Sequence, residues 1–548
     1  NKDIDPQEIR SMRESILNLH ASGENMIFKR ARVARILDNP YFGRIDFRRL
    51  GENSKVTPIY IGVHNFYDHK ERVNLIYDWR APVAGMYYEH ELGEAEYDSP
   101  EGVVKGEISL KRQYRIRKSR LEFMFESSVT IQDDILQKEL VTNTDEKMRN
   151  IVATIQKEQN RIIRNMDALV LIIQGVAGSG KTSIALHRIA YLLYAMKGGL
   201  ESSDVLIISP NKVFADYISN VLPELGEEMV PESSVGEILA GVLDSRYRYQ
   251  TFLEQAEMLI TDPQPAYVER MRYKSSYEFV TQLERFIIFA ENNFFKAADL
   301  KLTEHITIPS EYIDAQFRRF NRYPMRVRFD AMADYIVEMA YVDCRISVST
   351  FDRRKIKQKI KGMFIGNDDI DVYKRFYSWT GNPGMFKPRK DRSLEYSDLA
   401  PLAYIHLAFE GSSCIYKVKH LLIDEMQDYT PIQYKVLQKL FNCRKTILGD
   451  IGQSLIPYTS SDASMIRKVF VNGVVMKLSK SYRSTYEIAA FINEFKDSSY
   501  DSLGIICRSE RLASELKEFL SVYVDDINHI STKTAAFSKG VVITSVSM

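Results

Sequence analysis

Hydrophobic residues near the start of the chain recur at alternating steps of three and four. Between about residue 6 and residue 38 this spacing is typical of one long helix with an apolar seam. Seven of the nine seam positions from Ile9 to Leu37 are apolar, and the exceptions are Gly23 and Arg30. The seam predicts that the helix packs against a partner, either another helix or the next domain.

A different pattern begins at Tyr41 and continues to about Ile116. Short runs in which apolar and polar residues alternate, such as Val73–Asp78 and Gly106–Lys111, are separated by turn sequences rich in Gly and Pro. This alternation predicts a small antiparallel sheet. A helical pattern is predicted to return over residues 119–165.

Short, mostly apolar runs replace the alternation after residue 168. Leu169–Ile173, Val205–Ile208 and His420–Ile423 have the composition of strands buried on both faces of a parallel sheet. About 200 mainly helical residues separate the second run from the third, and we interpret them as a large insertion into one α/β domain. A second, shorter α/β region is predicted after about residue 477, with strands near Val474–Leu478, Leu503–Cys507 and Val541–Thr544.

Composition limits the class of protein. The 548 residues predict three to four domains, and 45% hydrophobic with 27% charged residues is typical of a globular chain, which excludes a small binding module and a disordered protein. The chain has 74 basic and 73 acidic residues, so its net charge is only +1. Any contact with nucleic acid must therefore be confined to a local groove or patch. The four cysteines are too widely spaced for a zinc site or a disulfide framework.

The sequence also carries signals about the location of the protein in the cell and about the ends of the chain. No apolar run approaches the ~18 residues of a membrane span, so we expect a cytoplasmic protein without membrane contact that acts as a monomer. Both ends have the character of cuts, because there is no initiator Met and the chain stops directly after a strand-like run. We therefore expect further sequence beyond Met548.

The strongest chemical signal is Gly175-Val176-Ala177-Gly178-Ser179-Gly180-Lys181-Thr182, which follows an apolar strand and opens a helix. This is the context of a phosphate-binding loop, in which backbone N–H groups and the helix N-terminus surround the phosphates of ATP. Lys181 would bridge the β- and γ-phosphates, and Thr182 would ligate Mg²⁺. The predicted nucleotide-binding residues of the loop are Gly175, Ala177, Gly178, Ser179, Gly180, Lys181, Thr182 and Ser183.

Two acids follow the third apolar run, in Leu421-Leu422-Ile423-Asp424-Glu425. A strand that ends in acids places Asp424 at the carboxyl edge of the sheet, beside the phosphate loop, where it can hold Mg²⁺ together with Thr182. Glu425 is placed to orient or deprotonate the attacking water. The two motifs together predict an ATPase.

The residues around these motifs resemble the superfamily 1 helicases of the UvrD/Rep type. Asp424-Glu425-Met426-Gln427-Asp428 is similar to their D-E-x-Q-D signature, Leu448–Ser454 to their third motif and Ser481–Ser484 to their fourth. The resemblance implies four further roles: γ-phosphate sensing by Gln453, adenine stacking by Tyr482, a phosphate finger at Arg483, and adenine reading by Gln159.

Other runs narrow the resemblance to the HelD family of bacterial ATPases. Tyr77–Pro82, Pro100–Glu107 and Asn39–Arg44 are similar to its N-terminal region, and the T-F-H single-strand motif of UvrD/Rep helicases is absent after Ser209–Lys212. The resemblance implies RecA-like P-loop motor domains, with an N-terminal arm and a helical insertion that enter the channels of bacterial RNA polymerase core. It also implies an ATP-driven transcription factor that displaces DNA and RNA from the polymerase and recycles it.

The implied domain division follows the changes of pattern along the chain. It is 1–40 for the helical arm, 41–150 for the β-rich module with its trailing helix, 151–230 and 411–476 for the two parts of the first motor domain, 231–410 for the helical insertion, and 477–548 for a truncated second motor domain.

The insertion leaves two interpretations open at equal weight. The basic run Arg353–Lys361, and the mixed aromatic and basic segment Tyr373–Arg392, would suit base stacking and phosphate contacts. They suit equally a helical core with a solvated basic face. Trp79 and His187 are predicted to be structural, with Trp79 packing the N-terminal module onto the motor.

Two alternatives to polymerase recycling remain. One is a conventional UvrD-like 3'-5' DNA helicase or translocase, whose ATPase would respond strongly to single-stranded DNA alone. The other is a nucleotide-gated binding protein in which hydrolysis only times release, and polymerase release unaffected by Glu425→Gln would favour it. The sixth helicase motif, with its second γ-phosphate arginine, falls beyond Met548, so ATPase measurements belong to the full-length protein.

Overall fold

The computed structural model of the chain describes most of the N-terminal module, the first motor domain and the helices between its strands. The residues described are 26, 30, 32–51, 55–126, 155–175, 179–210, 222–223, 225, 227–261, 263–302, 306–344, 350–366, 368–411, 417–451, 462–478, 502–507, 527–529 and 540–545. Of the long helix predicted for residues 6–38, residues 32–38 are described as a continuous helix. The first part of that prediction lies outside the described residues.

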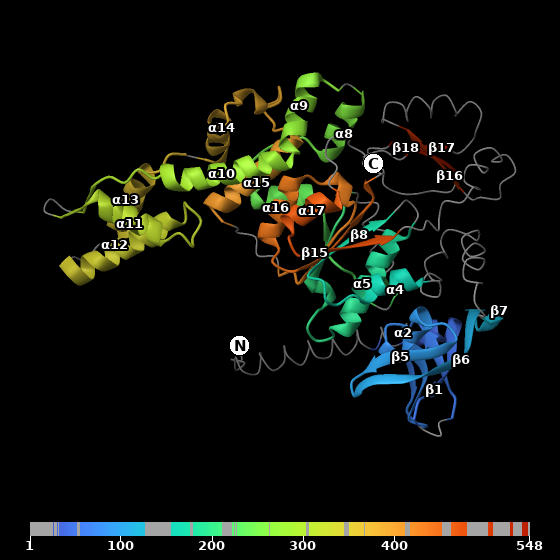
Figure 1. Ribbon diagram of the computed structural model, residues 1–548. Coiled ribbons are helices and arrows are strands. Elements are labelled where there is room, and N and C mark those ends of the chain that lie inside the picture. The colour runs from blue at the N-terminus through green and yellow to red at the C-terminus, as the bar shows by residue number, and fades with distance from the viewer. Residues whose placement is uncertain are drawn as a thin grey trace, which may run out of the picture.

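The structure contains the sheet that the alternating pattern after Tyr41 predicts. Its sheet has the order β3-β4-β2-β1-β6-β5, with β7 paired to β6, and all of these pairs are antiparallel except β2 with β4. The helix α2 (Pro82–Glu89) lies beside the sheet (Figure 1). The strands are β1 (Gly43–Arg49), β2 (Thr57–Gly62), β3 (Phe66–Asp68), β4 (Val73–Asp78), β5 (Gly93–Ser99), β6 (Gly102–Arg117) and β7 (Arg120–Glu126).

The prediction of helix over residues 119–165 is wrong at its start. Residues Arg120–Glu126 form β7, which continues the sheet as a hairpin with β6. Lys118 and Ser119 both have positive φ, 47° and 60°, which is the backbone of a two-residue hairpin turn. Tertiary pairing with β6 therefore overrides the local helical pattern. Helix does return at α4 (Lys157–Arg164).

The α/β motor is built on a six-stranded sheet. The order is β10-β9-β13-β14-β8-β15, and every pair is parallel. The three strands predicted by apolar runs all belong to it. The members are β8 (Val170–Gly175), β9 (Val205–Ile208), β10 (Glu232–Ser233), β13 (His420–Ile423), β14 (Arg444–Gly449) and β15 (Gly473–Leu478).

The assignment of Val474–Leu478 to the second α/β region is wrong. These residues form β15, which pairs in parallel with β8 along its whole length and closes one edge of the first sheet. A buried strand has the same apolar pattern in either sheet. Only the pairing with β8 shows to which sheet Val474–Leu478 belongs. The separate sheet β16-β18-β17 is also parallel and contains β16 (Ser502–Cys507), β17 (Ile527–His529) and β18 (Gly540–Ser545).

Successive residues of the motor strands face two different cores. Leu421 and Ile423 of β13 pack with the helices that lie between β10 and β13 in the sequence, whereas Leu422 packs with α4, α5 (Lys181–Ala195) and the N-terminal module. This alternation is what burial on both faces of a parallel sheet requires. The second core runs without interruption from the N-terminal sheet to the motor.

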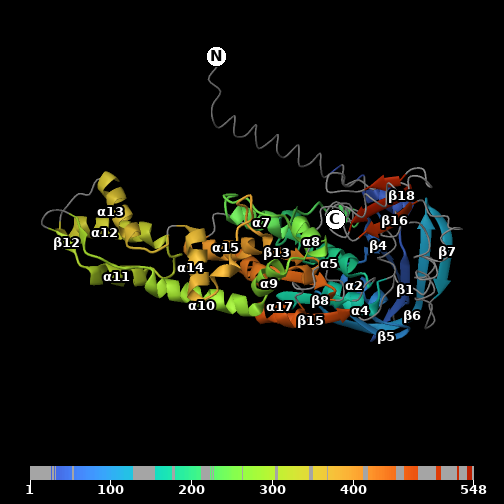
Figure 2. The same ribbon diagram turned by 90° about the horizontal axis from the view of Figure 1, so that it is seen from above.

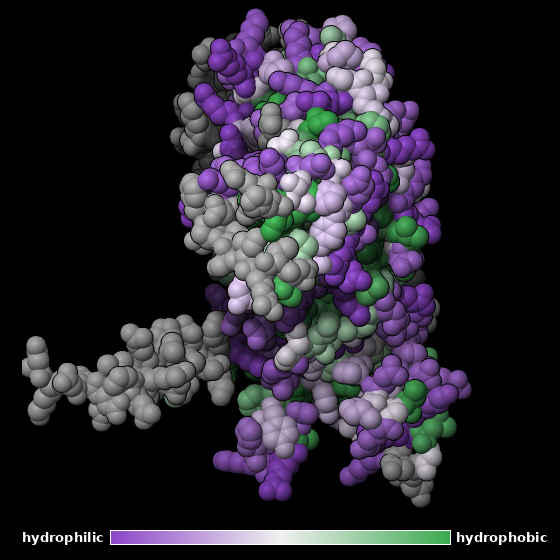
Figure 3. Space-filling model, turned by 90° about the vertical axis from the view of Figure 1, so that its left-hand side faces the viewer, coloured by the Kyte–Doolittle hydropathy of each residue, from purple (hydrophilic) through white to green (hydrophobic). Residues whose placement is uncertain are grey.

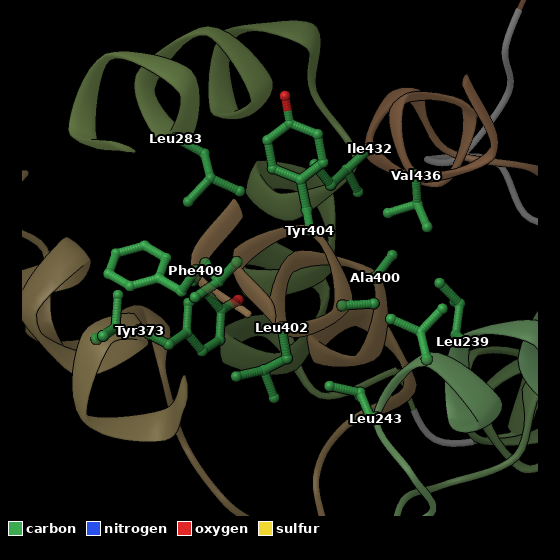
Figure 4. Close-up of a cluster of buried hydrophobic side chains, with 14 of the residues drawn as sticks. Leu239, Leu243, Leu283, Tyr373, Ala400, Leu402, Tyr404, Phe409, Ile432 and Val436 are labelled. Atoms are coloured by element: carbon green, nitrogen blue, oxygen red, sulfur yellow. The ribbon is translucent and has the colours of Figure 1, made fainter. Parts of the chain in front are cut away.

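Helices occupy most of the chain between β10 and β13. Figures 1 and 2 show α10 running away from the sheet to α11, α12 and α13 at the far end of the molecule. Figure 4 shows α15 at the centre of the proximal part, where Leu402, Tyr404 and Phe409 meet side chains of α7, α10, α14 and α16. The helices are α7 (Val235–Val242), α8 (Phe252–Thr261), α9 (Pro265–Lys274), α10 (Tyr277–Asn293), α11 (Ser310–Arg319), α12 (Arg328–Cys344), α13 (Thr350–Gly362), α14 (Asp369–Trp379) and α15 (Tyr396–Phe409), followed after β13 by α16 (Pro431–Leu440) and α17 (Ala463–Val469).

The structure favours the helical-core interpretation for the aromatic segment of this region. Tyr373, Phe376 and Tyr377 are buried, so their rings are not available for base stacking, although Trp379 is partly exposed. In the basic run, Arg353 and Lys357 of α13 pair with Asp334 and Asp330 of α12. Among the described helices, none is both long enough and apolar enough to span a membrane.

Candidate functional site

The carboxyl ends of three neighbouring strands bring the predicted motifs together. β14 lies between β8 and β13, and all three run in the same direction. The phosphate loop follows β8, Asp424 follows β13 and Asp450 follows β14. Ligands of open parallel sheets bind at this edge, so chain segments about 250 residues apart meet at one candidate site.

The phosphate loop has the backbone that its glycines permit. Gly180 has φ +79°, a left-handed conformation that side chains other than glycine rarely adopt. A Cβ on Gly175 would lie 2.4 Å from Oγ of Ser179 and 2.9 Å from Cγ of Lys181. Ser179 and Lys181 therefore lie close against the end of β8, at the N-terminus of α5, where a helix favours bound anions.

Lys181 points back across this loop. Its Nζ donates a hydrogen bond to the Gly175 carbonyl at 3.0 Å and lies 3.9 Å from Oδ2 of Asp450. The hydroxyl of Ser179 is buried and has no hydrogen-bond partner within the described part of the chain. A partly buried cation beside an unsatisfied hydroxyl, at a helix N-terminus, fits the phosphates of a nucleotide.

Thr182 and Asp424, the two residues expected to bind a cation, lie in contact with each other. The Thr182 side chain hydrogen-bonds the Asp424 carboxylate, which is almost fully buried. Burial first, and the neighbouring Glu425 carboxylate second, raise the pKa of Asp424 well above its usual range, while Lys181 and Thr182 act in the opposite direction. A buried carboxylate and a hydroxyl are oxygen donors of the type that Mg²⁺ prefers, so these residues fit the ion.

Glu425 stands in a conformation that costs backbone energy. Its φ of 51° and ψ of 53° are left-handed, which is rare for a residue that is not glycine and is concentrated at functional sites. Its Oε2 accepts a hydrogen bond of 2.7 Å from Nε2 of Gln427, and Oε1 of Gln427 accepts one of 2.9 Å from the Asp450 backbone. Gln427 thus ties the acid after β13 to the strand end of β14.

Gln427 and Asp450 were absent from the residues predicted for the site. Both stand inside motifs quoted for the helicase resemblance, so the signal was present in the sequence. What the sequence did not reveal is the bridge between them, because the two residues are 23 positions apart and meet only when β13 pairs with β14.

Gly449→Ala is expected to lower the ATPase rate of the full-length protein by about tenfold. A Cβ at this position would lie 2.3 Å from Oε1 of Gln427 and 2.6 Å from the Met426 backbone nitrogen, so Gln427 and Glu425 must shift. A misplacement of about 1 Å can cost up to about 10²-fold in rate. Steady-state ATP hydrolysis measures the effect. Gly236→Ala in α7 is the matched control, since its Cβ would meet nothing closer than 3.8 Å, and equal rates in the two variants would contradict the expectation.

Gln159 of α4 contacts the phosphate loop from the other side. Its Nε2 lies 3.4 Å from the Ser179 carbonyl oxygen, and its Oε1 accepts a hydrogen bond from the Gln156 backbone. Ser183 follows Thr182 in α5, with its hydroxyl 3.3 Å from Nδ1 of His187. The other predicted site residues, Ala177, Gly178, Gln453, Tyr482 and Arg483, lie outside the described residues.

The structural roles predicted for Trp79 and His187 are confirmed. Trp79 is completely buried, and its ring meets the His187 ring edge to face at a centroid distance of 5.5 Å. Burial lowers the pKa of His187 to about 4, so the imidazole is neutral near pH 7. Trp79 therefore packs the N-terminal module directly onto the helix that begins with Lys181.

Two family profiles match the chain. Residues 5–143 match the family model described as "DNA helicase IV HelD, N-terminal domain". Residues 159–459 match the family model described as "AAA domain". The second match covers more than half of the chain and contains the phosphate loop, Asp424 and Glu425.

Curated relatives match shorter stretches. The ATP-dependent DNA helicase srs2 of Schizosaccharomyces pombe is 33% identical over 104 residues, which are 18% of this chain and 12% of the relative. The putative ATP-dependent DNA helicase YjcD of Bacillus subtilis is 29% identical over 114 residues, which are 19% of this chain and 15% of the relative.

The chain thus aligns with only 12% and 15% of the length of these two relatives. The two profiles, in contrast, follow one another along most of the chain, with the helicase-type ATPase domain directly behind the HelD N-terminal domain. The chain therefore belongs to the HelD-type, superfamily 1 helicase-like P-loop ATPases.

Proposed function

We propose that this protein hydrolyses ATP and uses the cycle to displace DNA and RNA from bacterial RNA polymerase core, which recycles the enzyme. The observation that supports hydrolysis is the meeting of Lys181, Asp424 and Glu425 at one edge of the motor sheet. The link to the polymerase is supported by the HelD N-terminal domain and by its continuous core with the motor. We propose a cytoplasmic monomer.

Each residue of the proposed site would have a separate role in ATP hydrolysis. Lys181 and the N-terminus of α5 would hold the β- and γ-phosphates. Thr182 and Asp424 would hold Mg²⁺, which neutralises charge that develops on the phosphates. Glu425 would orient the attacking water and accept its proton, while Gln427 fixes the carboxylate.

Four more residues complete the proposed site. Gln159 would contact the adenine, Tyr482 would stack on it, Gln453 would sense the γ-phosphate and Arg483 would reach that phosphate from the second α/β unit. Closure of the two units over ATP would then require contacts from both, which is how such a site can convert ATP binding into movement.

The helices at the far end of the molecule suit a lever more than an apolar docking surface. α10 carries α11–α13 away from the motor sheet (Figures 1 and 2). The face that contains these helices is mainly hydrophilic, with scattered hydrophobic side chains (Figure 3). We propose that this insertion enters the polymerase DNA channel and the N-terminal arm enters a second channel.

A conventional UvrD-like 3'-5' DNA helicase or translocase is the second candidate. It is favoured by the names of the two relatives and of the N-terminal profile, which all denote DNA helicases. It would use the same ATP residues but would grip single-stranded DNA across both motor domains.

Steady-state ATPase of the full-length protein separates the two candidates. It is measured alone, with single-stranded DNA and with RNA polymerase core, at two salt concentrations. Stimulation by polymerase core but not by DNA supports recycling. Stimulation by DNA alone, falling steeply with salt, refutes it in favour of the helicase.

A further inference from the structure

The N-terminal module, residues 41–126, holds both helices that border the phosphate loop. α4 carries Gln159, and α5 begins with Lys181 and Thr182. Helix α2 of the module packs against α4, and Figure 1 shows it on the side of the motor where α4 and α5 lie. The contacts are polar and partly buried, and their hydrogen bonds fix the orientation of the helices as well as holding them together.

The first contact passes through the residue next to Gln159. Asn160 is completely buried, and its Nδ2 donates a hydrogen bond of 2.7 Å to Oε1 of Glu89, the last residue of α2. Its Oδ1 accepts a hydrogen bond of 3.1 Å from Nε of Arg164. Because Asn160 directly follows Gln159 on a helix of eight residues, a bond that fixes Asn160 also fixes the rotation of Gln159 about the helix axis.

The second contact passes through Arg164, one turn further along α4. Its guanidinium donates to the carbonyl oxygens of Trp79, Arg80 and Ala81, at 2.7, 3.3 and 3.4 Å. It also lies over the ring of Tyr191 in α5, at 5.1 Å from the centroid. A Cβ on Gly85 of α2 would already stand 3.5 Å from the guanidinium carbon. One side chain therefore joins the module, α4 and α5.

We infer that the N-terminal module is a positioning element of the nucleotide site, and that Glu89, through Asn160, sets Gln159 against the phosphate loop. The inference rests on the proposed function, in which ATP binds at this loop and Gln159 contacts its base. Lys181 and Thr182 are held independently, by β8 and Asp424. Recognition of the base therefore depends on the bond between Glu89 and Asn160, whereas recognition of the phosphates by Lys181 and Thr182 does not involve that bond.

Glu89→Ala in the full-length protein tests this separation. Loss of one buried hydrogen bond is expected to raise the Kd for ATP about five- to tenfold. The Kd for tripolyphosphate, which has the phosphates without the base, is expected to change by less than about twofold, since the loop keeps its own contacts. Calorimetric titration with Mg²⁺ present measures both constants, and thermal unfolding of each variant monitors the fold.

Two further variants sharpen the experiment. Glu89→Gln keeps an oxygen that accepts from Asn160 and is expected to bind ATP within about twofold of the unchanged protein. Glu101→Ala, at an exposed turn of the same module, is the matched control and is expected to change neither constant.

The outcomes are distinct. If Glu89→Ala weakens the binding of ATP and of tripolyphosphate equally, or weakens the binding of neither, the positioning role is overturned. So does an unchanged protein that binds ATP no more tightly than tripolyphosphate, because the base would then contribute nothing. An unchanged protein that binds neither ligand refutes the proposed function itself, and the inference falls with it.

Discussion

Lys181→Met is expected to lower ATP hydrolysis by the full-length protein at least about 10³-fold. The ammonium lies 3.0 Å from the Gly175 carbonyl oxygen and 3.9 Å from Asp450, so it stands between the ends of β8 and β14. Methionine has a similar length and no charge, and it can neither neutralise the phosphates nor donate to them. Steady-state hydrolysis and a Kd for ATP measure the loss in rate and in binding.

A matched variant distinguishes the loss of Lys181 at the site from the loss of one positive charge near the same helix. Lys197 is exposed just beyond the end of α5, and Lys197→Met removes the same charge there. It is expected to hydrolyse ATP within about twofold of the unchanged protein, as surface substitutions usually leave the fold intact. If Lys181→Met retained a tenth or more of the rate, the loop would not be where the γ-phosphate is cleaved.

Lys274→Met is expected to destabilise the helical insertion by about 3–5 kcal/mol. Nζ of Lys274 lies 2.6 Å from Oδ1 of Asp398 and 3.0 Å from Oε2 of Glu395, and all three side chains are buried. Without the ammonium, Asp398 keeps a hydrogen bond from the Tyr373 hydroxyl, and Glu395 keeps Arg270. Arg270 would then pair with Glu395, and Asp398 would lose the cation that it contacts. Native-state hydrogen exchange of α9, α14 and α15 measures the local free energy of opening.

The loss of stability caused by Lys274→Met should depend on pH in a defined direction. Burial, above all, raises the pKa of Asp398, and Lys274 opposes that rise. Removing Lys274 raises this pKa further, so the folded variant takes up a proton more readily than the unfolded chain. A raised pKa stabilises the fold below the unfolded value of 3.8, and that stability is lost as pH rises through the folded pKa.

The deficit of Lys274→Met is therefore expected to be larger at pH 8 than at pH 5. Lys361→Met, at an exposed position of α13 in the same insertion, is the control and should change stability by less than about 0.5 kcal/mol at either pH. Equal deficits for Lys274→Met at pH 5 and pH 8 would show that lost packing, not the buried carboxylates, causes the effect.

The elements that the sequence predicted correctly are those whose signal is local. The phosphate loop needs Gly at particular backbone positions and Lys and Thr at the start of a helix, all within eight residues. The acids after β13 need only a buried strand in front of them. The structural role of Trp79 was likewise predicted from its place beside a strand that ends at Pro82. Such features depend on short-range sterics and periodicity, which can be read along the chain.

The tertiary structure decided what depends on pairing between distant residues. A periodic pattern does not say which sheet a strand joins, so the sequence alone places β15 in the wrong region and predicts helix where β7 pairs with β6. The bridge from Glu425 through Gln427 to Asp450 exists only because β13 lies beside β14. The bond between Glu89 and Asn160 joins residues 71 positions apart. Sequence by itself determined which chemical groups this ATPase carries, whereas long-range packing decided which groups hold one another, since those contacts form only on folding.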